Sequence, residues 1–239
     1  MSEILQPALK NFLSSYSIDE KLDYLPENNY APTIYSAFDI SSEENVLIKV
    51  WPRRKGLDND LLSLWDTELR QMQRFDGLAG VREYLITIQG AGIDDDGFYL
   101  VLGPGELRPI AWHQRNAKNR KTLATKNSTR KLLWTNFHRI AKGLGILHSQ
   151  GLLHRNVSES SVFTENGSVP DYRLGGFEWN IRLNSIDDRS VPTMYNSDIS
   201  SRASFQHDWM AFAHLALRML EVPIEDLSLI HISEPTRPY

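Results

Sequence analysis

Short runs rich in β-branched and aromatic residues occur in the first half of the chain. Residues 33–38 and 46–51 form two such runs, separated by a polar turn, and this composition is typical of β-strands. Two more strand-like runs, residues 83–89 and 98–102, flank an Asp-Asp-Asp-Gly sequence at residues 94–97. That sequence predicts a hairpin, because Asp and Gly adopt the backbone conformations of tight turns.

Longer segments have apolar residues at the three- and four-residue spacing of an amphipathic helix. They span residues 61–75, 132–148 and 208–220, and the first 20 residues show the same spacing. Brief strand-like pieces lie between residues 151 and 174. We therefore expect a small antiparallel sheet with one helix inserted after its third strand, followed by a mainly helical part.

These patterns divide the 239-residue chain into four segments. We expect an amphipathic lead-in at residues 1–20, a sheet-rich unit at 21–103 and a helix-rich unit at 104–226. The last segment, residues 227–239, resembles the translation of a sequencing-library adapter, and we exclude it from the fold. On this interpretation the natural protein continues beyond Asp226, with a sequence that is unknown.

Composition excludes several classes of protein. The chain has no cysteine, which excludes disulfides, thiolate metal sites and cysteine nucleophiles. The formal net charge is −4, so no global nucleic-acid footprint exists. No run of about 18 apolar residues occurs, and the first ten residues lack the features of a signal peptide. We expect a cytoplasmic protein with no membrane partner.

One basic stretch, residues 115–131, contains seven Lys and Arg residues and no acidic residue. Such stretches are most often solvated loops, and a docking surface for an acidic protein or nucleic acid is the alternative. No aromatic residue follows Trp112 within the stretch, so bases would find no stacking partner there. We do not expect nucleic acid as a partner, and this stretch is the one candidate surface for it.

Several motifs occur in the order in which the protein kinase family has them. Residues 46–49 (Val-Leu-Ile-Lys) resemble the Val-Ala-Ile-Lys motif of that family's third strand, and Glu68 follows where the family has an ion-pairing glutamate. Residues 147–155 end in His-Arg and are similar to the start of the catalytic loop. Residues 174–178 (Leu-Gly-Gly-Phe-Glu) align with the family's metal-binding motif, and Asp208 opens a helix as a buried aspartate does in the family.

The resemblance covers roughly residues 20–221 and implies an α+β fold with two lobes, of which the second is incomplete. In such a fold a nucleotide would contact the lysine and glutamate of the first lobe and the connection between the lobes. The residues in those positions are Lys49, Glu68, Leu102, Gly103 and Gly105.

The residues that hold the family's fold are present. The resemblance implies that Lys49 and Glu68 form an ion pair and that Asp208 braces the backbone of the His-Arg loop. It also implies that His154 and Phe177 stack within the interior.

The residues that carry phosphoryl transfer in the family are replaced. Asn156 stands where the resemblance places the catalytic aspartate, and an amide cannot act as a base at neutral pH. Ser158 replaces a lysine, and Ser161 replaces a metal-binding asparagine. Gly176 stands where the magnesium-binding aspartate would be and offers no oxygen ligand.

The glycine-rich loop of the family is also absent. Its three glycines align with Glu27, Asn29 and Pro32. Pro32 has no backbone N–H group and Glu27 adds negative charge, so we expect no backbone cradle for phosphates.

Three acidic residues lie close to the replaced positions in the sequence. Glu159, Asp171 and Glu178 are candidates for a shifted metal ligand, but a solvated surface is the interpretation we prefer. We therefore expect no intact catalytic residue, no metal site and, apart from Glu68, no acidic side chain beside Lys49 that would hold a magnesium-bound triphosphate. The prediction of inactivity depends on this last expectation.

The sequence thus predicts a catalytically inactive pseudokinase that acts as a scaffold or allosteric module for a protein partner or fused domains. No cofactor is required, although ATP without magnesium is a possible ligand. One alternative is a divergent active Ser/Thr protein kinase that uses shifted carboxylates. The other is a module that binds a nucleotide without metal.

Overall fold

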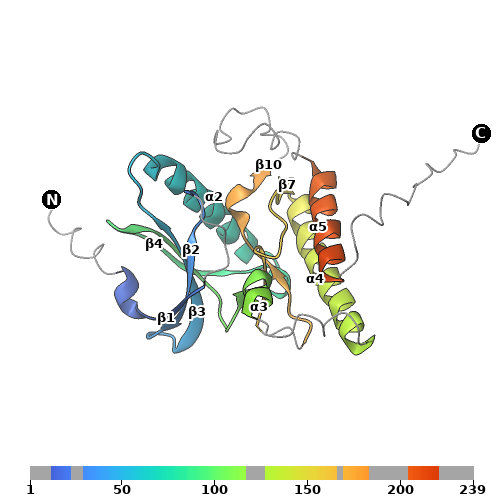
Figure 1. The fold of residues 1–239 in the computed structure, drawn as a ribbon. Coiled ribbons are helices and arrows are strands. Elements are labelled where there is room, and N and C mark those ends of the chain that lie inside the picture. Colours follow the sequence, from blue (N-terminus) through green and yellow to red (C-terminus); the bar gives the residue numbers. More distant parts are fainter. Residues whose placement is uncertain (1–11, 23–28, 117–126, 166–168, 183–203, 221–239) are drawn as a thin grey trace, which may run out of the picture.

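The computed structural model of the chain describes residues 12–22, 29–116, 127–165, 169–182 and 204–220. Within them, a five-stranded antiparallel sheet is followed by a mainly helical part (Figure 1). The fold is therefore mixed α and β, as the sequence predicted. Among the described residues, no helix is both long enough and apolar enough to cross a bilayer.

The sheet has the strand order β1-β2-β3-β5-β4, and all neighbouring strands are antiparallel. Its strands are β1 (Tyr16–Leu22), β2 (Thr33–Asp39), β3 (Glu44–Pro52), β4 (Ile88–Ile93) and β5 (Gly97–Leu102). The predicted hairpin joins β4 to β5. Its turn forms because Asp94 Oδ1 accepts hydrogen bonds from the N–H groups of Asp96 and Gly97 at 2.8 and 3.0 Å.

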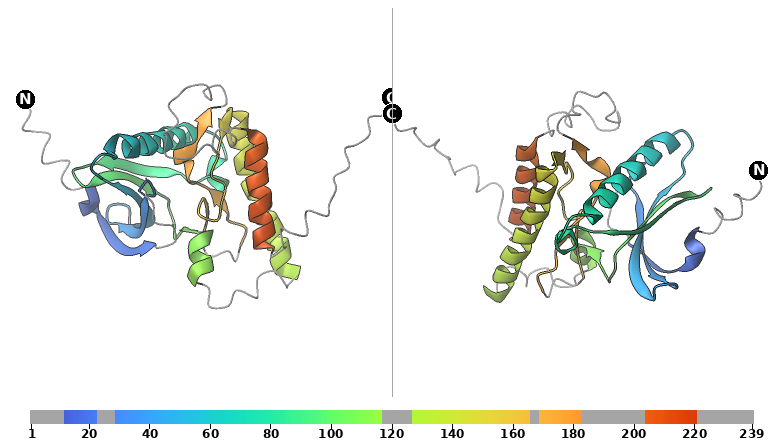
Figure 2. Two further views of the ribbon diagram at one scale, coloured as in Figure 1. Left: turned by 45° about the horizontal axis from the view of Figure 1, so that its top comes forward. Right: turned by 180° about the vertical axis from the view of Figure 1, so that it is seen from behind.

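Helix α2 (Asp58–Asp76) packs across one face of the sheet (Figure 2). Its apolar residues recur at helical spacing and are buried against the sheet, as predicted for residues 61–75. Trp65 Nε1 donates a hydrogen bond to the backbone oxygen of Tyr99 at 2.9 Å, which fixes the helix against β5. This helix brings an acidic side chain over the centre of the sheet.

The opposite face of the sheet is covered by η1 (Phe12–Ser15), where the ring centroid of Phe12 lies 5.3 Å from that of Tyr99. We expected a helical lead-in through residue 20, but this 3₁₀ turn is followed directly by β1, which begins at Tyr16. The expectation is wrong here because β1 is an edge strand. Most of its side chains are exposed, so no alternating apolar pattern marks it.

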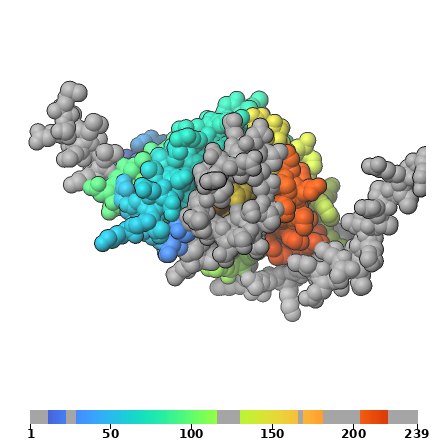
Figure 3. Space-filling model, turned by 90° about the horizontal axis from the view of Figure 1, so that it is seen from above, coloured from blue at the N-terminus to red at the C-terminus, as the bar shows by residue number. Residues whose placement is uncertain are grey.

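The helical part is built on α4 (Asn127–Ser149) and α5 (Phe205–Met219), which lie side by side (Figures 1 and 2). Figure 3 shows α5 on the side of the molecule opposite to α2. Shorter elements complete the described structure. They are η2 (Val81–Glu83), β6 (Arg108–Pro109), α3 (Ile110–Asn116), β7 (Leu152–Leu153), β8 (Val162–Thr164), β9 (Arg173–Leu174), η4 (Phe177–Trp179) and β10 (Ile181–Arg182).

The strand predicted at residues 83–89 is wrong in its bounds, because β4 begins at Ile88. The apolar residues before it pair with β9 instead. The N–H of Ile86 donates to the oxygen of Leu174 at 2.9 Å, and the N–H of Leu174 donates to the oxygen of Tyr84 at 2.8 Å. These bonds join the sheet-rich part to the helical part.

Some predicted features lie outside the described residues. They are residues 1–11 of the lead-in, Glu27, the middle of the basic stretch (117–126), residues 183–203 and 221–226 of the helix-rich unit, and the tail at residues 227–239. The two ends of the basic stretch belong to helices α3 and α4 and not to a loop.

Candidate functional site

A buried ion cluster, formed by Lys49, Glu68 and Glu178, lies where β3, α2 and η4 meet. Lys49 Nζ is 2.6 Å from Glu68 Oε2 and 2.9 Å from Glu178 Oε2. The exposed fractions of the three side chains are 4%, 1% and 8%, respectively. One ammonium group thus pairs with two carboxylates inside the protein.

The spacing of side chains along β3 and α2 places Lys49 and Glu68 in this cluster. Lys49 shares a face of β3 with the buried Leu47 and Trp51, and this face is turned toward α2. Glu68 lies on the buried stripe of α2, and its Oε1 also accepts the N–H of Phe177 at 3.3 Å. The predicted Lys49–Glu68 ion pair is therefore confirmed.

Burial and the shared charge shift the pKa values of the cluster. Burial raises the pKa of Glu68 from 4.5 to about 7, although Lys49 opposes the rise, and the nearby Glu178 adds to it. Burial acts in the same direction on Glu178, but Lys49 outweighs it and holds that pKa below its usual value. Burial alone would lower the pKa of Lys49, whereas the two carboxylates raise it. At neutral pH Lys49 and Glu178 are therefore charged, and Glu68 is the group that titrates.

Gly176 leaves room for the carboxylate of Glu178. Its φ is +74°, and a Cβ added there would lie 3.2 Å from Ser161 Cβ and 3.7 Å from Glu178 Oε2. Glu178 thus reaches the space beside the missing side chain from two residues further along. We expected a solvated Glu178 and no acid other than Glu68 beside Lys49, and both expectations are wrong. The predicted inactivity therefore cannot rest on a missing carboxylate at this place.

The other two acids considered as shifted ligands are held elsewhere. Glu159 contacts Arg218 through both carboxylate oxygens, at 2.6 and 2.9 Å. Asp171 accepts hydrogen bonds from Thr164 Oγ1 at 2.6 Å and from the N–H of Glu165 at 2.8 Å. Asp171 is buried, so the expected solvated surface is wrong for this residue too. Only one of the three acids joins the buried ion cluster.

Asp208 of α5 fixes the backbone of the loop that carries His154 and Arg155. Its Oδ2 accepts the N–H of His154 and its Oδ1 accepts the N–H of Arg155, each at 2.7 Å. His148 Nε2 lies 2.9 Å from Oδ2. Burial alone would raise the pKa of Asp208, but these hydrogen bonds bring it below its usual value. The expected brace is confirmed.

The rings of His154, Phe177 and Phe75 form a stack of edge-to-face contacts between the same elements. The ring centroids of His154 and Phe177 are 5.7 Å apart, and those of Phe75 and Phe177 are 5.4 Å apart. Burial lowers the pKa of His154, and its Nε2 lies 2.9 Å from the backbone oxygen of Gly175. The stack holds η4, and with it Glu178, against α2.

The positions predicted to have lost catalytic residues lie close together. Asn156 and Ser158 line a pocket of about 440 Å³. Ser161 Oγ accepts the N–H of Ser158 at 2.9 Å and donates to its carbonyl oxygen at 3.1 Å, so this hydroxyl is engaged with backbone. In the described part of the chain, no group of three or more His, Cys, Asp or Glu residues is arranged to hold a metal ion.

The connection after β5 uses its backbone donors internally. The N–H of Gly103 donates to the oxygen of Thr87 at 3.2 Å, and the N–H of Gly105 donates to the oxygen of Asn45 at 2.9 Å. Leu102 is buried at the end of β5, opposite Leu47. The residues predicted to contact a nucleotide are therefore divided between the buried ion cluster and a connection whose glycine N–H groups are occupied.

Comparisons with known proteins give no relative: no family model matches the sequence, and no curated protein matches it.

Proposed function

We propose that this chain is a protein-kinase-like domain that has lost phosphoryl transfer and serves as a scaffold or allosteric module for a protein partner. The observation that carries the proposal is the state of Lys49. The carboxylates of Glu68 and Glu178 both bind its ammonium group already, and all three groups are buried. A phosphate would have to displace one of these carboxylates from a site with little access to solvent.

The order of elements supports the kinase-like part of the proposal. The antiparallel sheet carries its helix after the third strand, and Lys49 and Glu68 pair across them. Asp208 braces the loop that follows α4, and Phe177 stacks on His154. These are the contacts that the resemblance to protein kinases led us to expect.

Two further features support the absence of nucleotide chemistry. Leu47 stands where the family's Val-Ala-Ile-Lys motif has alanine, and its larger side chain is fully buried opposite Leu102. The N–H groups of Gly103 and Gly105, candidates for binding a base, donate to backbone oxygens. A nucleotide would therefore compete with packing and with hydrogen bonds that the protein already makes.

The proposal is tested by measuring nucleotide binding and turnover with the purified chain. Thermal unfolding with ATP and magnesium, and with ATP and a chelator, should give the same midpoint as without nucleotide. A clear stabilisation with ATP and chelator would support instead a module that binds nucleotide without metal. Magnesium-dependent ATP turnover or autophosphorylation that Lys49→Ala abolishes would overturn the proposal.

Glu178 supports a second candidate, a divergent active Ser/Thr protein kinase. Its carboxylate lies beside Lys49 and next to the space that Gly176 leaves open. In that case Glu178→Gln should reduce turnover at least about tenfold. Asp66→Asn, which changes a half-buried acid of α2 outside the buried ion cluster, is the matched control and should leave turnover unchanged.

A further inference from the structure

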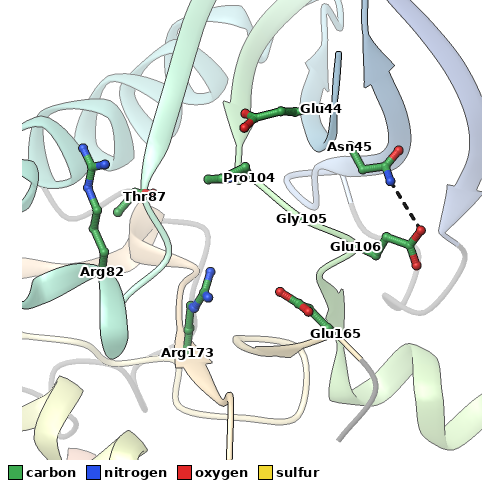
Figure 4. A pocket seen from close by; sticks show the side chains of 9 residues that line it. All are labelled: Glu44, Asn45, Arg82, Thr87, Pro104, Gly105, Glu106, Glu165 and Arg173. Carbon is green, nitrogen blue, oxygen red and sulfur yellow. Dashed lines mark hydrogen bonds between the residues drawn. The ribbon is translucent and has the colours of Figure 1, made fainter. Parts of the chain in front are cut away.

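A second pocket, of about 550 Å³, shares no residue with the buried ion cluster (Figure 4). It lies where β3 begins, and the connection after β5 and the segments around β8 and β9 form its other walls. Its lining is rich in charged side chains of both signs. The lining residues are Glu44, Asn45, Arg82, Thr87, Pro104, Gly105, Glu106, Glu165 and Arg173.

Arg173 and Glu165 are the two charged side chains of this pocket that lack a partner among the described residues. Arg173 points into the pocket, and its Nε is buried with no acceptor (Figure 4). Glu165 is exposed on the other side, where a Cβ on Gly105 would lie 3.1 Å from its Oε1. The glycine therefore lets this carboxylate lie against the connection. Opposite charges thus face the same space without forming an ion pair.

The positive charge of Arg82 at the rim is already paired. Its Nη2 lies 3.0 Å from Asp76 Oδ1. Of the two guanidinium groups at this pocket, Arg173 is therefore the one without an ionic partner among the described residues.

The remaining acids of the pocket have polar partners of their own. Glu44 Oε2 accepts a hydrogen bond from Gln89 at 3.1 Å, and Glu106 Oε1 accepts one from Asn45 at 3.3 Å. Both partners are neutral amides, so neither of these hydrogen bonds is an ion pair. The pocket as a whole therefore has more negative than positive groups.

We propose that this pocket binds a ligand that carries both a carboxylate and a cationic nitrogen. The planar guanidinium of Arg173 matches a carboxylate, and Glu165 offers a counter-charge for the cation. The three carboxylates of the lining disfavour a ligand with several negative charges, such as a polyphosphate. A volume of about 550 Å³ lies within the range of pockets for small molecules or a few residues of peptide. This inference does not depend on the proposed function.

A carboxylate and a cationic nitrogen occur together in two kinds of ligand. One is a free amino acid, and the other is a peptide with neighbouring acidic and basic side chains. Calorimetric titration of the full chain distinguishes them with two probes. L-lysine carries the charges of a free amino acid, and an N-acetylated, C-amidated Gly-Glu-Lys-Gly peptide carries them only in its side chains. We expect saturable binding of at least one probe below about 10 mM, and the probe that binds identifies the source.

Variants then connect the binding to the pocket. Glu165→Gln changes an exposed side chain and should fold, and it should weaken the bound probe at least about tenfold. Arg173→Gln should also weaken binding of the probe at least about tenfold. If this variant does not fold, Arg173→Lys, which keeps the positive charge, takes its place. Arg70→Gln alters an exposed arginine of α2 and serves as the matched control, with unchanged affinity.

Three results would overturn the inference. If neither probe saturates below about 10 mM, the pocket has no affinity for a ligand that carries a carboxylate and a cationic nitrogen. Equal binding by wild type and Glu165→Gln would place the binding elsewhere. Tighter binding of inorganic phosphate than of either probe would show a site for anions only.

Discussion

The pKa of Glu68 makes the stability of the protein depend on pH in the neutral range. Its carboxyl has a pKa of about 7 in the folded state against 4.5 as its ordinary value. The folded state therefore binds this proton more tightly than the unfolded chain does. The resulting stabilisation is fully present below pH 4.5 and is lost as the pH rises through about 7.

The size of this change in stability follows from the pKa shift of Glu68. A rise from 4.5 to about 7, at about 1.4 kcal/mol per pH unit, corresponds to roughly 3 kcal/mol. Glu178 acts in the opposite direction, because its pKa is lowered by Lys49. Its stabilisation is present above pH 4.5 and is lost as the pH falls through its lowered pKa, so it contributes little change between pH 5 and 8.5.

Urea unfolding measured from pH 5 to pH 8.5 tests this reasoning. The free energy of unfolding of the wild type should fall across the range, by up to roughly 3 kcal/mol relative to Glu68→Gln. The readout is the slope against pH and not the absolute stability, which the variant also changes. Asp66→Asn, which changes a half-buried acid on the same helix, should keep the wild-type slope. Parallel curves for wild type and Glu68→Gln would refute the argument.

Three other substitutions test contacts of the site through urea unfolding at pH 7. Lys49→Met leaves two buried carboxylates without a counter-charge and should cost about 3–5 kcal/mol, whereas a loss below about 1 kcal/mol would show that the cluster is solvated. Asp208→Asn removes one of two oxygens that accept loop N–H groups and should cost about 1–3 kcal/mol, so an unchanged midpoint would contradict the brace. Gly176→Ala should cost about 1–2 kcal/mol, because φ is +74° and the Cβ would lie 3.2 Å from Ser161 Cβ, and a gain in stability would count against this geometry.

Local sequence patterns predicted most of the regular elements. Helix α2 shows clear helical periodicity, and strands β2 and β3 are rich in β-branched and aromatic residues. The bounds of all three agree with the expected runs within a few residues. Strand β1 has no such pattern, since it is an edge strand with mostly exposed side chains. Helix α3 spans only Ile110–Asn116 and was not predicted.

The pairing of distant segments was harder to predict. Residues 84–86 look like a strand of the main sheet, but they pair with Leu174. Glu178 looks like a surface acid two residues after a glycine, yet the packing of Phe177 on His154 turns it toward Lys49. The sequence signal for it was an acid, Glu178, two positions after Gly176, where the resemblance to protein kinases places a carboxylate. The pocket of Arg173 and Glu165 gave no signal, because its residues come from distant parts of the chain.

The most direct test of the account is magnesium-dependent ATP turnover by the purified chain, with Lys49→Ala as the reference. We predict that the wild type and this variant are indistinguishable, because Glu68 and Glu178 already pair with Lys49. Turnover that depends on magnesium, disappears in Lys49→Ala and falls in Glu178→Gln would contradict it.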